Sequence, residues 1–385
     1  MLPYTTSNFF VLSAIAVLLL FFVKKISTHH KYYQYTLLAI SVSYAIFIFP
    51  KPHLLVGYIV YAYVAHHLFV QKIKSQNKLL GTLAIVLPML AIKSSILMGI
   101  HGDTFRSLFS FAGLSYITFR TASVYIESSP GDKSLSPLKY ANYLLFTPTL
   151  LIGPIDRFQR FNNDIKQGWN RVNLEFVLEG FQMILFGIMH KFILAEAVSR
   201  YWLNADLNIS GITANINEMY AYWFFLYFDF AGYSAMAIGL GKIMGIDVPI
   251  NFNKPFLARN PQDFWRRFHK SLGDWLNDYF FKPMYMFFSR KKNLKKHPLL
   301  RQNVSLFLTF LLMGFWNGFQ IHFIVSGALF GLYSLLYNSY VYKCKKAQKD
   351  IIFRNLKKTT VTIISIFITF NIAAFSLYIF SGRLF

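Results

Sequence analysis

The sequence predicts an all-α, polytopic integral membrane protein, and three observations support this fold class. Of the 385 residues, 55% are hydrophobic and only 14% are charged, whereas soluble domains carry about 25% charged residues. Apolar runs recur along the chain at lengths that suit a hydrocarbon core of about 30 Å. The basic residues gather in short segments between these runs. Together these observations exclude an ordinary soluble domain.

The apolar runs, taken in chain order, predict about eleven transmembrane segments. The first run is followed at once by Lys24 and Lys25 and not by a small-residue cleavage site, so we expect an uncleaved helix and not a signal peptide. Some runs are short enough to form paired half-helices. The runs cover 8–23, 35–50, 54–70, 79–99, 104–126, 138–153, 175–196, 219–242, 304–316, 320–341 and 359–381.

The excess of positive charge is explained best by membrane topology. The chain holds 39 Lys and Arg against 16 Asp and Glu, a formal net charge of +23, which in a soluble protein would suggest nucleic acid. Here the positive residues lie in 24–34, 71–78, 289–302 and 342–358. Short basic loops are typical of the cytoplasmic side, where they meet anionic lipid headgroups. We therefore expect the N-terminus outside, membrane lipids as partners, and no nucleic acid.

The chain gives no sign of a second domain or of a metal site. Its single cysteine, Cys344, lies among lysines, which excludes an internal disulfide and argues against a cysteine-based metal site. No linker or repeat of fixed period is present, so we expect one membrane domain over 1–385. A transporter would be expected to show repeated halves, and none is found.

The stretch "MGFWNGFQIHF", residues 313–323, interrupts two apolar runs with polar side chains. The runs 304–316 and 320–341 predict a hairpin whose bend points away from the cytoplasm. A bend at membrane depth must be buried in protein or line a watery cavity. On one continuous helix, His322 would lie roughly 140° around the axis from Asn317, so only a break at Gly318 would bring them together.

Residues 250–288 mix aromatic and charged side chains and predict an amphipathic helix, either interfacial or re-entrant. Arg266, Lys270 and Asp274 form a polar stripe at helical spacing. An apolar stripe accompanies it, made by Phe264, Phe268, Leu272, Trp275 and Tyr279. The alternative is an interfacial helix with no catalytic role, whose cations extend toward water.

Several ionisable residues fall outside these patterns. Asp229 lies inside an apolar run, where an ionisable group is costly and is usually paired or functional. We interpret Asp156 and Arg157 first as an internal ion pair, with a role at the site as the alternative. His66, His67 and His190 are interpreted as packing histidines.

Three stretches in order resemble the membrane-bound O-acyltransferase family. They are "FTPTLLIGPIDRFQRF" (146–161), "YFDFAGYSAMAIGLGKIMGIDVPINFNKPF" (227–256) and "DFWRRFHKSLGDWLNDYFF" (263–281). Within the family they are most similar to the D-alanyl transfer proteins of the DltB type, and the alginate O-acetylation proteins are related. The resemblance covers a core of 100–335, between N-terminal helices in 1–100 and a basic loop with a last helix in 336–385.

The resemblance implies helices around a central funnel, in a bacterial cytoplasmic membrane. A D-alanyl thioester would reach the funnel on the phosphopantetheine arm of a small acidic carrier protein (DltC-like), and the acceptor would be a hydroxyl of a cell-envelope polymer such as teichoic acid. No cofactor is expected to be bound by the chain itself. A small accessory membrane peptide is a further expected partner.

The family places one histidine in "WRRxH" and a second, thought to be catalytic, in "MGxWHG". The first falls on His269, and the second falls on Asn317, which is not a histidine. An amide donates hydrogen bonds but takes no proton near neutral pH. A general base contributes on the order of 100- to 10,000-fold, so its loss would raise the barrier by about 3 to 5.5 kcal/mol.

The resemblance and the residues together give the candidate site. His269 is a candidate base with Asn317 as a polar helper, and His322 is a weaker candidate base. Carrier or substrate contacts are expected from Trp265, Arg266, Arg267 and Trp316, with Asp229, Asp156 and Arg157 as further candidates. A guanidinium here would suit a phosphate.

Three alternatives to an active D-alanyl transferase stay open. The chain is an enzyme disabled by an introduced His→Asn change at 317, a naturally weak or silent member that binds the carrier as a scaffold, or an O-acetyltransferase of an exopolysaccharide or glycolipid. The sequence alone does not choose among these alternatives.

Overall fold

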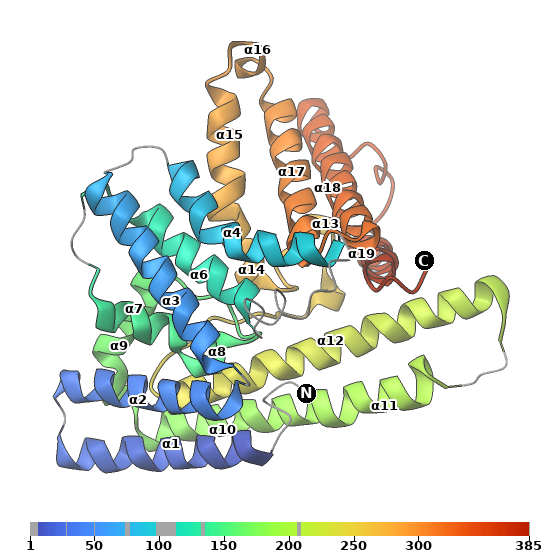
Figure 1. The fold of residues 1–385 in the computed structure, drawn as a ribbon. Coiled ribbons are helices and arrows are strands. Elements are labelled where there is room, and N and C mark those ends of the chain that lie inside the picture. The colour runs from blue at the N-terminus through green and yellow to red at the C-terminus, as the bar shows by residue number, and fades with distance from the viewer. Residues whose placement is uncertain are drawn as a thin grey trace. The chain divides into compact units, whose positions relative to one another are not determined.

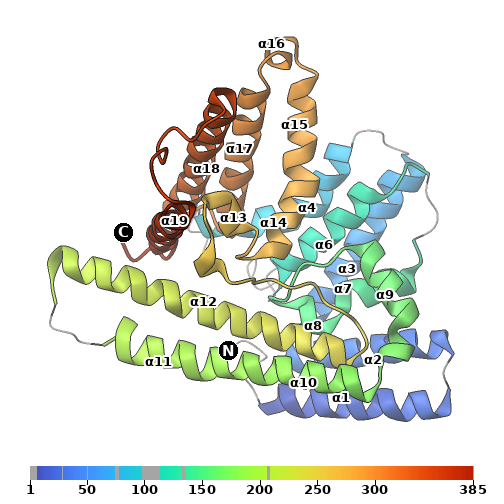
Figure 2. The ribbon, with the colours of Figure 1, turned by 180° about the vertical axis from the view of Figure 1, so that it is seen from behind.

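The described residues form helices, turns and loops, and no strand occurs among them. The computed structural model describes residues 7–27, 29–49, 51–73, 78–97, 113–131, 135–205 and 209–384. Figures 1 and 2 show the helices from opposite sides. The predicted all-α fold class is confirmed.

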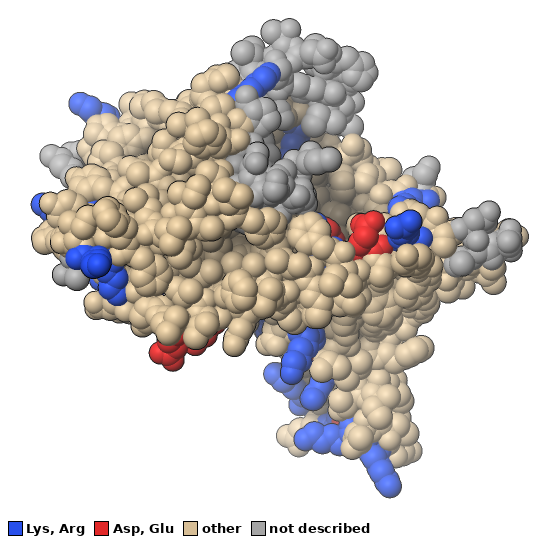
Figure 3. Space-filling view, turned by 90° about the horizontal axis from the view of Figure 1, so that it is seen from below, with Lys and Arg blue, Asp and Glu red and all other residues tan. Residues whose placement is uncertain are grey.

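Six of the described helical segments are long and apolar enough to cross a membrane. They are Pro52–Lys72, Leu174–Leu203, Gly211–Ile243, Pro298–Asn317, Ile321–Ala347 and Lys358–Phe380. Large apolar side chains face outward, as Leu18 at 70% and Ile363 at 63% exposure illustrate. The face in Figure 3 is mostly neither basic nor acidic, with Lys and Arg in separate groups. An integral membrane protein is confirmed, while the number of about eleven segments stays a prediction.

The chain forms two compact units, Met1–Met189 with Gly232–Pro249, and His190–Ala231 with Ile250–Phe385. The division of the sequence into one domain with three parts stays a prediction. The first unit holds α1 (Ser7–Ile26), α2 (His30–Ile48), α3 (Pro52–His67), η2 (Leu68–Lys72), α4 (Lys78–Leu97), α6 (Leu114–Glu127), α7 (Pro137–Leu145), α8 (Thr147–Leu150), α9 (Phe158–Arg171), α10 (Leu174–Ile188) and the last part of α12 (Gly211–Ile243).

The run 138–153 does not form one continuous helix. The chain there forms α7 and then α8, which have 9 and 4 residues and are separated at Phe146. Pro148 lies in the first turn of α8, and a proline has no N–H for the bond that one continuous helix would make to Leu144, four residues earlier. Of the predicted segment 104–126, the described part is α6, and 104–112 lie outside the described residues.

The second unit begins with η3 (Met189–Ala195, of which Met189 belongs to the first unit), α11 (Glu196–Val198), η4 (Ser199–Leu203) and the first part of α12. It continues with η5 (Pro255–Leu257), α13 (Pro261–Trp265), α14 (Lys270–Leu276), η6 (Asn277–Phe281), α15 (Lys282–Ser289), α16 (Lys292–Lys295), α17 (Pro298–Asn317), α18 (Ile321–Ala347) and α19 (Lys358–Phe380).

The predicted hairpin near the C-terminus is confirmed. Helix α17 ends at Asn317, Gly318 is extended, and α18 begins at Ile321. The two helices lie side by side with α19 in both views (Figures 1 and 2). A bond from Nδ1 of His322 to the backbone oxygen of Phe380 (2.8 Å) joins the start of α18 to the end of α19. The basic segments 289–302 and 342–358 therefore share the opposite end of these helices.

The single amphipathic helix predicted within 250–288 is wrong. Helix α13 ends at Trp265, and α14 begins at Lys270 after His269, whose φ of 52° and ψ of 46° are left-handed. Backbone hydrogen bonds to an earlier segment cause this break in the helix. The N–H of Lys270 donates to the backbone oxygen of Asn251 (2.9 Å), and the N–H of Asn253 donates to the backbone oxygen of Arg267 (2.9 Å). These bonds hold the chain in a turn that a continuous helix would exclude.

Helices α17 and α18 approach each other at backbone distance through two glycines. A Cβ on Gly327 would lie 2.6 Å from the backbone oxygen of Phe310, and a Cβ on Gly314 would lie 2.6 Å from that of Phe323. Small residues at such crossings allow van der Waals contact between helices in a membrane. The hairpin therefore requires glycine at both positions.

We expect Gly327→Ala to lower the thermal unfolding midpoint in detergent, because the added methyl group must push the two backbones apart. Overpacking of this kind costs about 1–3 kcal/mol. The matched control is Gly57→Ala in α3, where an added Cβ meets nothing within 4 Å; it should keep or raise the midpoint, because Ala favours a helix over Gly. An unchanged midpoint for Gly327→Ala would contradict the close approach.

Candidate functional site

The helix that carries the "WRR" element is started by Asn260. Its side chain accepts the N–H of Asp263 (2.8 Å), and Pro261 follows in the first turn. Asp263 in turn accepts from the guanidinium of Arg267 (2.9 Å), which also reaches the backbone oxygen of Asn253 (3.4 Å). Arg267 is thereby held within this local structure.

Aromatic packing fixes the side chain of Trp265. Its ring centroid lies 4.9 Å from that of Phe330 on α18 and 5.8 Å from that of Phe310 on α17. The preceding Phe264 is fully buried, stacks on Phe330 and contacts the buried Trp223 of α12 at 5.7 Å. Helix α13 is therefore anchored to three long helices of its unit.

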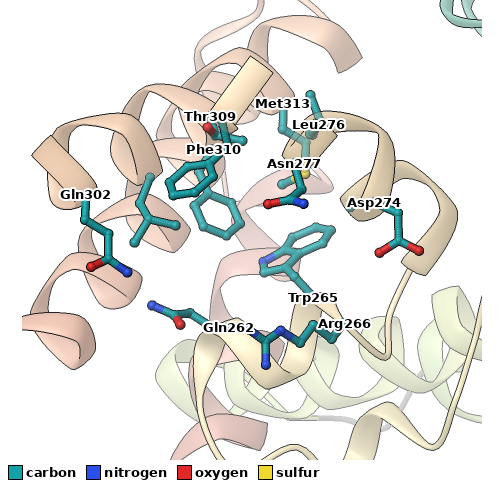
Figure 4. Close-up of a pocket in the computed structure, with 13 residues that line it drawn as sticks. Gln262, Trp265, Arg266, Asp274, Leu276, Asn277, Gln302, Thr309, Phe310 and Met313 are labelled. Atoms are coloured by element: carbon teal, nitrogen blue, oxygen red, sulfur yellow. The ribbon is translucent and has the colours of Figure 1, made fainter. Parts of the chain in front are cut away.

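Trp265 and Arg266 border a cavity of about 290 Å³, formed by α13, α14, η6 and α17 (Figure 4). One part of its wall is apolar, with Leu276, Phe310 and Met313, and another is polar, with Gln262 and Gln302. The remaining lining residues are Gly273, Asp274, Asn277, Phe281, Leu306 and Thr309. Apolar walls with a few placed polar groups are typical of a small-ligand site.

His269 is held by Asn251 and does not line this cavity. Its Nδ1 lies 3.0 Å from Oδ1 of Asn251, and its ring contacts Phe230 at 4.8 Å. The same Oδ1 accepts the N–H of Ser271 (3.3 Å), an obligatory donor, which identifies this atom as oxygen. Nδ1 of His269 must then donate, so Nε2 carries the lone pair.

Burial of the ring lowers the pKa of His269 to about 3. His269 lies outside the six candidate spans. Its imidazole is therefore neutral at pH 7. A base with such a low pKa has little driving force to take a proton. The left-handed backbone costs roughly 1–2 kcal/mol for a residue other than glycine, which the bonds to Asn251 must offset.

Asn317 is exposed, and its Nδ2 donates to the backbone oxygen of Met313 (2.8 Å), one helical turn earlier. Met313 lines the cavity, whereas Asn317 itself does not. Asn317, where the resemblance leads us to expect a histidine, therefore lies one helical turn from the cavity wall. The half-buried Trp316 precedes it at the end of α17.

The premise that His322 shares a continuous helix with Asn317 is wrong, because the helix breaks at Gly318. His322 does not line the cavity after this break. Its ring lies 4.0 Å from that of Phe323, and its Nδ1 bonds the end of α19. His322 therefore joins two helix ends.

Asp229 forms an ion pair with Lys191 in the second unit, as expected of an ionisable group that is paired. His190 lies beside Phe228, with ring centroids 5.6 Å apart, as expected of a packing histidine. In the first unit, His66 is buried and its Nε2 lies 2.8 Å from the hydroxyl of Ser128.

Asp156 is buried in the first unit, where its main partner is Arg160 and not the predicted Arg157. Two bonds of 2.6 Å join the Arg160 guanidinium to both carboxylate oxygens, and Arg157 donates its backbone N–H (2.6 Å). Burial raises the pKa of the Asp156 carboxyl, and Arg160 opposes that shift. Arg160 lies within the quoted stretch 146–161, but the sequence does not show which of its two arginines the carboxylate reaches.

Within the described part of the chain, no group of three or more His, Cys, Asp or Glu is placed to hold a metal ion.

The profile of the membrane-bound O-acyltransferase family matches residues 128–381. The chain belongs to this family. The resemblance of the three motifs is thereby confirmed, and the chemistry of the chain is O-acyl transfer at a membrane.

Relatives of this O-acyltransferase include teichoic acid D-alanyltransferases. The chain is 37% identical to that of Bacillus subtilis (strain 168) over 72% of this chain and 70% of the relative. It is 33% identical to that of Streptococcus thermophilus over 99% and 95% of the two chains. The peptidoglycan O-acetyltransferase of Helicobacter pylori is 33% identical over 54% of this chain and 39% of its own.

Three residues of this membrane-bound O-acyltransferase were missed by the sequence analysis: Asn251, Gln262 and Gln302. Asn251 is fully buried and organises His269, and the two glutamines line the cavity. Only the position of Gln262 within the "PQDFWRR" segment gave a signal, since it is one turn before Arg266. The other two lie in unrelated segments and had none.

We expect this O-acyltransferase to lose stability as the pH falls from about 6.5 to 3, partly because of His269. The unfolded imidazole titrates near 6.5, so in this window the unfolded chain binds a proton that the folded chain excludes, and stability falls with pH. His269→Gln should flatten the curve of unfolding midpoint against pH, measured in detergent. The exposed His297 supplies the control, because His297→Gln should leave the curve as steep as before. Equal steepness for both variants would contradict the prediction.

Proposed function

We propose that this chain transfers D-alanine from a carrier-protein thioester to a hydroxyl of teichoic acid. The observation that carries the proposal is coverage: the teichoic acid D-alanyltransferases match 72% and 99% of the chain. The O-acetyltransferases match less, 54% for peptidoglycan and 59% for the probable alginate O-acetylase of Pseudomonas fluorescens. D-alanyl transfer is therefore favoured over O-acetylation.

The proposed donor is D-alanine on the phosphopantetheine arm of a small acidic carrier. Two basic segments, 289–302 and 342–358, share one end of the α17, α18 and α19 helices. Complementary charge speeds the encounter of an acidic protein with such an end and fixes its orientation. We place this end in the cytoplasm and the N-terminus outside, in a bacterial cytoplasmic membrane, by the positive-inside rule. A small accessory membrane peptide as a further partner belongs to the same proposal.

The proposed reaction has balanced steps. The acceptor hydroxyl oxygen attacks the thioester carbonyl carbon, the carbon–sulfur bond breaks, and the hydroxyl proton finishes on the departing thiol. Trp265 and Arg266 border the cavity in which we place the thioester, and the apolar Phe310 and Met313 limit water there. Exclusion of water protects the thioester from hydrolysis.

Proton removal is the step that this chain supports weakly. Asn317 takes no proton near neutral pH, and Nε2 of His269, with a pKa of about 3, is a poor base. We therefore propose slow transfer by the chain with Asn317. His269 acts in this scheme chiefly by holding the turn between α13 and α14.

We expect Asn317→His to raise the transfer rate on the order of 100- to 10,000-fold, because it introduces a general base. The measurement is transfer of radiolabelled D-alanine from loaded carrier to teichoic acid in membranes. Asn317→Gln is the control, since it lengthens the amide without adding a base and should bring no gain.

The same assay separates the remaining alternatives. Full activity of the unaltered chain, with no gain from Asn317→His, would contradict slow transfer. Carrier binding without transfer by either chain would show a silent scaffold. A preference for an acetyl over a D-alanyl donor would show an O-acetyltransferase.

A further inference from the structure

The cavity bordered by α13 carries two buried N–H donors that have no hydrogen-bond partner within the described part of the chain. They are Nε2 of Gln262 and Nε1 of Trp265. Both residues line the cavity, and Figure 4 shows the indole nitrogen on the side where Gln262 lies. A buried donor without a partner is rare in folded proteins and calls for an explanation.

The spacing of the two residues makes them neighbours. Gln262 and Trp265 are three positions apart on α13, and residues at this spacing lie on one face of a helix. The side chain of Trp265 has little freedom to move, because its ring packs on Phe330 and Phe310. A Cβ on Gly273 would lie 3.1 Å from the backbone oxygen of Trp265, so α14 also packs tightly against this residue. The indole N–H is thus held in place before a ligand arrives.

We infer that these two N–H groups hold the carbonyl oxygen of the acyl thioester and the oxyanion that replaces it during transfer. The inference rests on the proposed function and assigns it two residues. When the hydroxyl oxygen attacks, the carbonyl π electrons move to this oxygen, and they return as the carbon–sulfur bond breaks. Donors aimed at the oxygen beforehand stabilise the charge that develops there.

The chemistry of the donors selects a carbonyl over other ligand groups. An indole N–H only donates, so it cannot hold the ammonium group of an alanyl residue. Both donors are neutral and lie beside an apolar wall that includes Phe310 and Met313. A neutral carbonyl enters such a place more easily than a phosphate dianion, whose burial is costly without a cation. Arg266, which is exposed at the same cavity, is the better phosphate partner.

The position of the cavity agrees with this role. Met313 lines it, and the backbone oxygen of Met313 accepts the bond from Asn317 at 2.8 Å. A histidine at 317 would therefore stand one helical turn from the wall that faces the donors. An acceptor hydroxyl between them would have a base on one side and the thioester carbonyl on the other.

The test uses Trp265→Phe, which keeps an aromatic ring and removes the N–H, and Gln262→Met, which keeps the length and removes the amide. In membranes of the full chain carrying Asn317→His, we expect each to lower kcat on the order of 100-fold, with a much smaller change in KM for the loaded carrier. Trp202→Phe is the matched control: its indole donates to Asn217 (2.9 Å), and kcat should stay the same. Unchanged kcat for Trp265→Phe and Gln262→Met would overturn the inference.

A binding measurement separates the inference from the proposed function. The probe is D-alanyl-aminopantetheine, in which an amide replaces the thioester, titrated calorimetrically into the purified chain in detergent. We expect the double variant to bind roughly tenfold more weakly than the unaltered chain, because two hydrogen bonds to the carbonyl are lost. Equal binding by both chains, or no binding by the unaltered chain, would overturn the assignment. Binding that depends on the donors, without any transfer to teichoic acid, would instead support the donors and refute the proposed acceptor.

Discussion

The candidate site depends on the hydrogen bonds that Asn251 accepts. Its Oδ1 accepts from His269, from the backbone N–H of Ser271 and from the Ser271 hydroxyl (2.9 Å), while its backbone oxygen accepts from Lys270. Backbone that is not helical must find partners inside a membrane protein, because lipid offers none. Asn251 satisfies the turn between α13 and α14, and both helices then contribute walls to the cavity.

A second constraint is the close contact between helices. Gly314 and Gly327 bring α17 and α18 together at backbone distance, which sets Phe310 and Phe330 beside Trp265. Dispersion and close fit dominate such contacts, since lipid is as apolar as the side chains. The position of one indole N–H thus depends on two glycines on other helices.

Asn317 stands where the resemblance leads us to expect a histidine, and its amide is bonded to the backbone oxygen of Met313 in its own helix. His269 is neutral because burial lowers its pKa, and its bonds orient the turn. In the proposed scheme, the two N–H donors and the apolar wall of the cavity are then the catalytic resources that remain. Electrostatic preorganisation accounts for a large part of many enzymatic accelerations, so a member with a weak base still has a physical basis for acyl transfer.

The sequence by itself determined the all-α membrane class, the hairpin of α17 and α18, and the family, because apolar length and ordered motifs are local properties. It did not determine the break at His269, the partner of Asp156 or the two donors of the cavity. Helical periodicity predicts which face of a segment is apolar, but a turn held by Asn251, 18 residues away, leaves no periodic trace. Only tertiary contacts decide which of two neighbouring arginines faces a cavity and which carboxylate a guanidinium reaches, because the bonds that fix them join distant segments.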